Sequence, residues 1–263
     1  MLRLYPNLNG LARYQFIVEY LGGGYRGVQF QPGLPTVEGA IRKALKRVGC
    51  GSDNLILAAR TDSGVHSVGQ VATVDVESPI SVDGLLKGMN CCLPSDIRVK
   101  AVSCVPGTFH PRGAARYREY RYWVTNEAIP LPLGYSISTI NSRLDIKRLN
   151  FFAEKILGTH DFSGFQKVGS TPKSTEKCII RSEFIEVKEE SKRFLSSLNL
   201  VCYVIVADSF LYRMVRNLVG AMLNAADGRL TESQFSFMLD EGIRRWPYVA
   251  APPEGLELFK IYY

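Results

Sequence analysis

Two apolar runs flank a short polar loop in the stretch Leu55–Val76, which reads LILAARTDSGVHSVGQVATVDV. The first run is Leu55–Ala59, and the second, Val68–Val76, is rich in β-branched residues. Apolar runs separated by Asp, Ser and Gly predict two strands joined by a tight loop. The loop, Arg60–His66, therefore places a carboxylate next to an arginine and a histidine.

The carboxylate of this loop, Asp62, has two interpretations. It can cap its own backbone in an Asx-turn, in which Gly64 supplies a positive φ. It can also be a reactive group that the loop holds between two strands. For a lone aspartate in a loop the Asx-turn is the favoured interpretation, so the rest of the chain has to show whether Asp62 is more than that.

The composition is that of a globular protein with an excess of positive charge. Of the 263 residues, 46% are hydrophobic and 22% are charged, which suffices to bury a core. The net charge of +7 suits a polyanionic partner such as nucleic acid, and equally an ordinary soluble protein. No apolar run reaches membrane-spanning length and no signal-peptide pattern is present, so we expect no membrane association.

Cysteine and histidine spacing argues against a metal site. The six cysteines form no CxxC pair, and the three histidines, His66, His110 and His160, share no zinc-type spacing with them. Scattered cysteines in a chain of this length are typical of reduced, buried side chains, so we expect a cytoplasmic protein. The first thirteen residues carry two arginines and no acid, which leaves an organelle as an alternative.

The order of the predicted elements favours an α+β fold of two similar halves. In the first half, residues 1–105, the order is strand, helix, two strands, helix and strand, which is typical of a ferredoxin-like layer. Its elements outside the Asp62 loop are the strand Arg13–Tyr20, a helix capped by Thr36, a helix beginning at Ser81 and the strand Ile97–Val105.

The second half, residues 106–263, continues with a similar order. Its expected elements are the strand Ala114–Val124, a helix capped by Asp145, strands Cys178–Lys188 and Arg193–Ala207 joined by a polar hairpin at 189–192, helices Phe210–Ala226 and Thr231–Asp240, and the strand Leu256–Tyr262. We therefore predict two ferredoxin-like (RRM-like) βαββαβ halves that share a continuous mixed or antiparallel sheet, with the helices on one side.

Arginines alternate with aromatic residues in the segment Phe109–Trp123. In a strand, Arg116, Arg118, Tyr120 and Tyr122 fall on one face, because side chains alternate with a period of two. Such a face can neutralise phosphates and stack on bases. Cross-strand aromatic pairing with solvated arginines explains the same pattern, and the segment alone leaves both explanations open.

The predicted helix Phe210–Ala226 carries two stripes. One is apolar and is typical of core packing, whereas Arg213, Arg216 and Gly220 lie along the other. An arginine in the first turns of a helix is not placed to complement the helix dipole, because that end is already positive. A carboxylate or a phosphate nearby would explain it.

These three segments resemble, in the same order, motifs of the TruA family of tRNA pseudouridine synthases. The departures from the family pattern are small: Ala59, Ser63 and Pro111 replace other small residues, and Glu119 stands between an arginine and a tyrosine. Three further segments are similar to family motifs, namely Tyr25–Gln31 with Val28 in place of tryptophan, His160–Phe165 with Gln166 in place of a following arginine, and Ala250–Leu256.

The resemblance implies an isomerase that converts uridine to pseudouridine in the anticodon arm of tRNA, with tRNA as partner and no cofactor or metal. It places catalytic roles on Asp62, as nucleophile or as the base of a glycal route, on Arg216, as its ion-pair partner, and on Tyr120, which positions the flipped base. The residues expected to bind substrate or RNA are Arg60, His66, Phe109, His110, Arg112, Arg116, Arg118 and Leu256. The two halves would form one catalytic unit, and a homodimer is a possible assembly.

Two other classes of protein remain as alternatives. A non-catalytic RNA-binding protein built of two RRM-like halves explains the charge and the aromatic residues, but it does not require Asp62, Tyr120 and Arg216 together. A phosphate-ester or nucleotide enzyme is disfavoured, because the chain has no P-loop and no clustered carboxylates for Mg²⁺.

Overall fold

The computed structural model describes residues 11–51, 53–77, 80–127, 137–140, 144–187, 199–244 and 249–263. The chain forms two compact units, which are described separately below. The first consists of Met1–Arg116 together with Leu258–Tyr263, and the second of Tyr117–Glu257. Each unit combines strands with helices, so the fold is α+β, as the sequence predicts.

The first unit is built on antiparallel strands in the order β4 (Ile97–Val105), β1 (Ala12–Tyr20) and β3 (His66–Val76). The short strand β2 (Ile56–Leu57) pairs with β3, and the C-terminal strand β10 (Leu256–Tyr262) also lies beside β3. A Cβ at Gly69 would collide with the backbone of Phe259, so glycine is needed where these two strands approach. Strand β10 is thereby attached to β3, the strand that follows the Asp62 loop.

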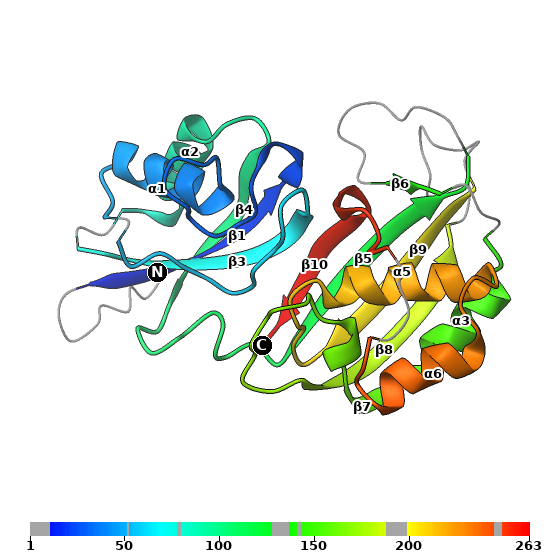
Figure 1. The fold of residues 1–263 in the computed structure, drawn as a ribbon. Helices are drawn as coiled ribbons and strands as arrows, with labels where there is room; N and C mark the ends of the chain where they lie inside the picture. The colour runs from blue at the N-terminus through cyan, green and yellow to red at the C-terminus, as the bar shows by residue number, and fades with distance from the viewer. Residues whose placement is uncertain are drawn as a thin grey trace. The chain divides into compact units, whose positions relative to one another are not determined.

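Helices α1 (Val37–Arg47) and α2 (Val82–Cys92) lie over one face of these strands (Figure 1). Their N-caps are Thr36, as the sequence predicts, and Ser81, where the second helix was expected to begin; each hydroxyl accepts from the backbone N–H three residues on. The core buries the predicted face of β1 against the apolar faces of both helices; it includes Tyr14, Phe16, Val18, Tyr20, Ile41, Leu45, Leu85 and Met89.

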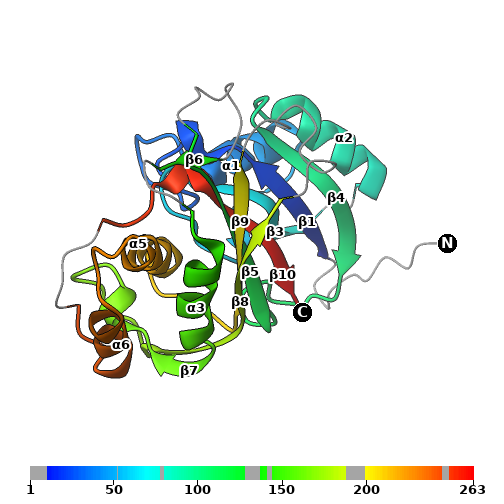
Figure 2. The ribbon, with the colours of Figure 1, turned by 90° about the vertical axis from the view of Figure 1, so that its right-hand side faces the viewer.

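The second unit is a mixed sheet covered on one face by helices. Its antiparallel strands follow the order β5 (Tyr117–Thr125), β9 (Leu200–Ala207), β8 (Glu176–Glu186) and β7 (Gly158–Asp161), and β6 (Ser138–Thr139) runs parallel to β5. Figure 2 shows α3 (Ile146–Lys155), α5 (Met214–Ala226) and α6 (Glu232–Asp240) on the same side of these strands. Phe235 packs between Phe152 and Phe165, with ring centres 5.1 and 5.8 Å away.

Several predicted element boundaries were wrong, and the short strands β6 and β7 were not predicted. The helix expected from Phe210 begins at Met214, because Arg213 adopts a left-handed backbone with φ of 62° that no α-helix continues. The strand expected at Leu55–Ala59 pairs only at Ile56–Leu57, and the strand expected from Ala114 begins at Tyr117. The polar hairpin at 189–192 lies outside the described residues.

Candidate active site

The Asp62 loop connects β2 to β3, and hydrogen bonds hold the residues that precede Asp62. At its start, the buried amide of Gln70 binds both backbone groups of Ala59, accepting from its N–H at 3.1 Å and donating to its carbonyl at 2.8 Å. One residue before the aspartate, the buried hydroxyl of Thr61 shares a 2.8 Å hydrogen bond with the Tyr20 hydroxyl. Asp62 itself is partly buried and Arg60 is exposed.

The turn after Asp62 contains the positive φ at Gly64 that we expected from the sequence. Gly64 has a φ of 82°, and the N–H of Val65 donates to the carbonyl oxygen of Asp62 at 3.2 Å. A left-handed residue is therefore needed here, and glycine supplies it without strain. The backbone turn and a chemical role of the carboxylate are compatible, because the turn uses the main chain of Asp62.

The segment after β1 braces the same loop from a second direction. Gly27 has a φ of 96°, and a Cβ there would lie 3.1 Å from the carbonyl oxygen of Thr61. Ser63 Oγ donates to the carbonyl oxygen of Tyr25 at 3.1 Å, and the N–H of Val28 donates to the carbonyl oxygen of Thr61 at 3.2 Å. Backbone and side-chain contacts thus hold the loop on both sides of Asp62.

His66, expected to bind RNA, is buried at the first position of β3. The N–H of Gly22 donates to its Nδ1 at 3.3 Å, so the ring proton of neutral His66 is on Nε2. Burial lowers the pKa of His66 below its usual range, which favours this neutral form. Within the described part of the chain, Nε2 has no hydrogen-bond partner.

A small cavity beside the loop brings two predicted RNA-binding arginines together. It encloses about 180 Å³, and Arg60 and Arg112 both line it. One Nη of Arg112 donates to the carbonyl oxygen of Leu57 in β2 at 3.1 Å, which anchors this exposed side chain next to the loop.

The other predicted residues of the first unit lie between β4 and β5. The ring of Phe109 packs against Tyr263, with centres 5.0 Å apart, and Nδ1 of His110 accepts from the N–H of Gly113 at 3.0 Å. The N–H of Arg116 donates to the carbonyl oxygen of Tyr262 at 2.8 Å, and Arg116 is exposed. Phe109 therefore has a packing role, whereas His110 and Arg116 are accessible.

In the second unit, Tyr120 lies on β5 and is 7% exposed. Its ring meets the edge of Phe210 at a centre-to-centre distance of 5.1 Å. Arg118, two residues earlier, donates to the carbonyl oxygen of Asp208, so part of its donor capacity is used inside the protein.

The chain before β10 collects the remaining predicted residues of this unit. Nε of Arg216 donates to the carbonyl oxygen of Ala251 at 2.7 Å. The next carbonyl, that of Pro252, accepts from the Tyr122 hydroxyl at 3.1 Å, and Leu256 is buried where β10 begins. Arg216 is thus bound to Ala251, in the short segment that leads to Leu256.

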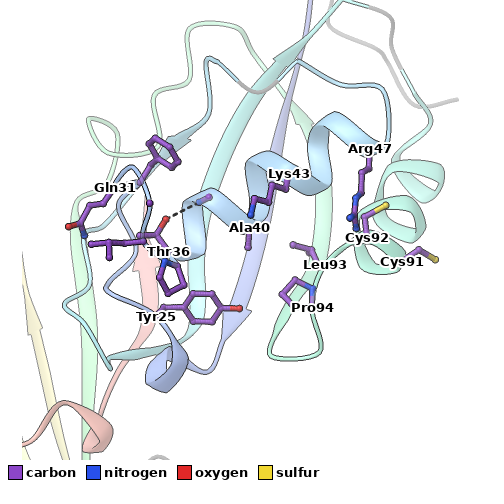
Figure 3. A pocket seen from close by; sticks show the side chains of 15 residues that line it. Tyr25, Gln31, Thr36, Ala40, Lys43, Arg47, Cys91, Cys92, Leu93 and Pro94 are labelled. Atoms are coloured by element: carbon purple, nitrogen blue, oxygen red, sulfur yellow. Dashed lines mark hydrogen bonds between the residues drawn. The ribbon is translucent and has the colours of Figure 1, made fainter.

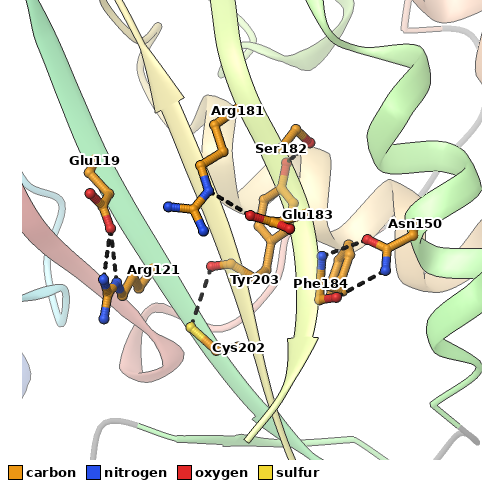
Figure 4. A network of polar contacts seen from close by, with 9 residues as sticks. All are labelled: Glu119, Arg121, Asn150, Arg181, Ser182, Glu183, Phe184, Cys202 and Tyr203. Carbon is orange, nitrogen blue, oxygen red and sulfur yellow. Dashed lines mark hydrogen bonds and ion pairs between the residues drawn. The ribbon is translucent and has the colours of Figure 1, made fainter.

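The opposite face of β5 shows a contact that the sequence analysis missed. Glu119, only 2% exposed, accepts from Nε and Nη2 of Arg121 at 3.0 and 2.9 Å (Figure 4). Trp123 Nε1 donates to Glu257 at 2.9 Å on the same face. The charge of Arg121 is therefore balanced within the sheet, and the period-two spacing of Glu119 and Arg121 was the available signal.

The residues that the structure describes contain neither a candidate metal cluster nor a helix that could span a membrane. Among them, no group of three or more His, Cys, Asp and Glu side chains could hold a metal ion. In the same part of the chain, no helix has both the length and the apolar character to cross a membrane.

Comparisons with known proteins identify the class. A family model described as tRNA pseudouridine synthase matches residues 152–263. The protein called tRNA pseudouridine synthase A in Thermoanaerobacter sp. (strain X514) is 35% identical over 96% of this chain and 100% of its own length. Its counterpart in Acetivibrio thermocellus is 34% identical with the same coverage, and that in Borreliella burgdorferi is 32% identical over 94% of this chain and 97% of its own.

A solved Cbf5-Nop10-Gar1 complex is far more distant, with 14% identity and a TM-score of 0.37 over 80% of this chain and 44% of that one. The sequence relatives match nearly the whole chain at about one third identity. The chain therefore belongs to the tRNA pseudouridine synthase A family, whose members are isomerases.

Proposed function

We propose that this protein isomerises uridine to pseudouridine within the anticodon arm of tRNA, with Asp62 as the nucleophile. In this reaction the N-glycosidic bond breaks, the uracil turns, and its C5 bonds to C1′ of the ribose while the proton on C5 is lost and N1 gains one. The observation that carries the proposal is the bracing of the Asp62 loop by Gln70, Tyr20 and Tyr25. A nucleophile has to be held in one geometry to attack one carbon atom.

Three residues are proposed to assist the carboxylate. Arg216 would pair with Asp62 and keep it ionised, since a nearby cation offsets the desolvation that raises the pKa of a carboxyl. Tyr120 would position the flipped base, and Leu256 would form the floor of the pocket that receives it. A base stacked in RNA has to leave the stack before its glycosidic bond can be reached.

RNA binding is proposed to use the exposed groups of the predicted set. Arg60 would occupy the space that the flipped base vacates, and Arg112, Arg116 and Arg118 would meet phosphates. His110 would offer its exposed ring to the RNA. His66 and Phe109 are proposed to support binding from within the protein, as positioning residues, because His66 accepts from the N–H of Gly22 and Phe109 packs against Tyr263.

The organisation of the protein is proposed on the same basis. We infer two ferredoxin-like halves, residues 1–105 and 106–263, that share one sheet and act as one catalytic unit. The element order of the first unit, β1-α1-β2-β3-α2-β4, supports the first half. We further propose a cytoplasmic enzyme without a cofactor. An organelle is the alternative location to be tested, and a homodimer is the alternative to a monomer.

The test is conversion of an unmodified tRNA transcript whose uridines carry tritium on C5. Because C5 exchanges its hydrogen for the bond to C1′, each turnover releases one tritium into water. We expect release with no metal added and with EDTA present, and pseudouridine mapped to the anticodon arm. Tight binding of tRNA without tritium release would support the non-catalytic alternative, and pseudouridine elsewhere in the tRNA would overturn the proposed position.

A further inference from the structure

The first unit contains a larger cavity that no role above uses. It encloses about 800 Å³ between α1, the C-terminal end of α2 and the segment Tyr25–Thr36 (Figure 3). This volume is within the range of sites that hold small molecules or single nucleotides. Two of the residues that line the cavity, Lys43 and Arg47, are exposed.

The wall formed by α1 contributes two cations to the cavity, Lys43 and Arg47. Gly39, Lys43 and Arg47 are spaced four residues apart and line the cavity, while Ile41 and Leu45 of the same helix face the core. None of the fifteen residues that line the cavity is acidic. Two cations without a lining carboxylate favour an anionic ligand.

The other end of the cavity is apolar and exposed. Phe30 and Leu34 line it, and 49% and 48% of these residues remain accessible. A Cβ at Gly39 would lie 3.5 Å from the Phe30 ring, so the ring rests on the first turn of α1. The N–H of Phe30 donates to Glu38 at 2.9 Å, and Arg42 lies 5.7 Å from the ring centre. An exposed aromatic ring held in place is a platform on which a base can stack.

The same segment also touches the Asp62 loop. Tyr25 lines the cavity, its hydroxyl donates to Asp96 at 2.7 Å, and its carbonyl oxygen accepts from Ser63, the residue after Asp62. The wall of the cavity and the loop are therefore joined through one residue. A polyanion that reaches Asp62 would have this basic cavity nearby.

We infer that this cavity binds an unpaired nucleotide of the RNA substrate other than the target uridine. Its base would lie against Phe30 and Leu34, and its phosphate would meet Lys43 and Arg47. The inference rests on the proposed function, because it takes tRNA as the ligand. It adds a second point of recognition that is separate from the flipped base.

The test compares two charge reversals on one helix. Lys43→Glu places a carboxylate in the cavity, whereas Lys46→Glu makes the same change at an exposed position that does not line it. We expect Lys43→Glu to raise KM for tRNA about tenfold with kcat unchanged, and Lys46→Glu to stay within about twofold of the parent. Phe30→Ala should raise KM without a change of charge. Equal effects of the two reversals, with an active parent, would overturn the inference.

Alkylation gives a second measurement that needs no substitution. Cys91 lines the cavity and is exposed, whereas Cys178 is half-buried in the second unit. Saturating tRNA should slow the reaction of iodoacetamide with Cys91 at least fivefold and leave Cys178 unchanged. Protection of Cys91 by uridine monophosphate but not by tRNA would overturn the inference in favour of a small-molecule site. A parent protein that neither binds nor converts tRNA would instead refute the proposed function.

Discussion

Arg216 and Ala251 are joined by two hydrogen bonds that run in opposite directions. Nε of Arg216 donates to the carbonyl oxygen of Ala251 at 2.7 Å, and the N–H of Ala251 donates to the carbonyl oxygen of Arg216 at 2.9 Å. One turn along α5, a Cβ at Gly220 would collide with the carbonyl oxygen of Val249. Arg216 and Gly220 therefore attach the chain at 249–251 to the helix, in addition to any role of Arg216 in catalysis.

We predict that Gly220→Ala destabilises the protein. Alanine improves the intrinsic helix propensity by about 1 kcal/mol, but the added methyl meets backbone, which cannot move aside as a side chain can. Overpacking of this kind costs roughly 1–3 kcal/mol, so the clash should win. Urea unfolding measures the difference. Gly51→Ala, where a Cβ meets nothing within 4 Å, is the control and should change the unfolding free energy by less than about 0.5 kcal/mol.

A double-mutant cycle tests the proposed pairing of Arg216 with Asp62. Arg216→Ala removes both the donor to Ala251 and the proposed cation, so single-turnover conversion should fall strongly. Arg216→Lys keeps the charge without the planar fork and should be impaired less. Breaking a buried ion pair costs about 3–5 kcal/mol, and these partly exposed groups should lose less.

The cycle combines Arg216→Ala with Asp62→Asn and follows the free energy of unfolding. The double variant should be less destabilised than the sum of the single variants, because no charge is left without its partner. The lost contact to Ala251 is common to both Arg216→Ala proteins and cancels. Strict additivity would show that Arg216 serves Ala251 and not Asp62.

His66 should make stability depend on pH. Its pKa in the folded protein lies below the usual value of 6.5, so between these two values the unfolded chain binds more protons than the folded one. Its contribution is therefore complete above pH 6.5 and is lost as the pH falls toward the folded pKa. His66→Asn offers an oxygen to the N–H of Gly22 and does not titrate.

The measurement is urea unfolding of both proteins at pH 7.5 and pH 5. The parent should lose more stability on acidification than His66→Asn does. His110→Asn, at an exposed position, should behave as the parent. An identical pH dependence of parent and His66→Asn would mean that the buried ring accepts a proton without penalty.

Salt dependence tests the phosphate contacts. If Arg112 and Arg116 neutralise phosphates, log Kd for tRNA should rise steeply with log salt, and each replacement by Ala should flatten the slope by about one unit. Arg148→Ala on α3 removes an exposed arginine outside the predicted RNA-binding segments and should leave the slope unchanged. A slope that no arginine replacement alters would indicate that these side chains are only solvated.

Local patterns predicted most of the secondary structure. The alternation of Tyr14 to Tyr20 described a half-buried strand. Thr36 and Asp145 each cap the helix that they were expected to cap, and Thr231, expected as the first residue of its helix, is the N-cap of α6. These features depend on neighbours within a few residues. The start of α5 could not be predicted, because the left-handed turn at Arg213 leaves no mark on the apolar periodicity.

The partners of the candidate site were harder to predict, because they come from distant parts of the chain. His66 receives its hydrogen bond from a residue 44 positions earlier, and Gln70 holds Ala59 across the loop. A glutamine within an apolar strand was the one visible sign of the second contact. Residue types in motifs indicated where chemistry was expected, while long-range hydrogen bonds decide how the loop is held.

The most direct measurement is tritium release from C5-labelled tRNA by Asp62→Asn beside the parent protein. The substitution is nearly isosteric, removes the charge, and leaves the contacts of Thr61 and Ala59 intact. We predict that the parent releases tritium without added metal, and that Asp62→Asn releases none while its Kd for tRNA stays within about threefold. Release by Asp62→Asn at a rate comparable to that of the parent would contradict the assignment of Asp62 as the nucleophile.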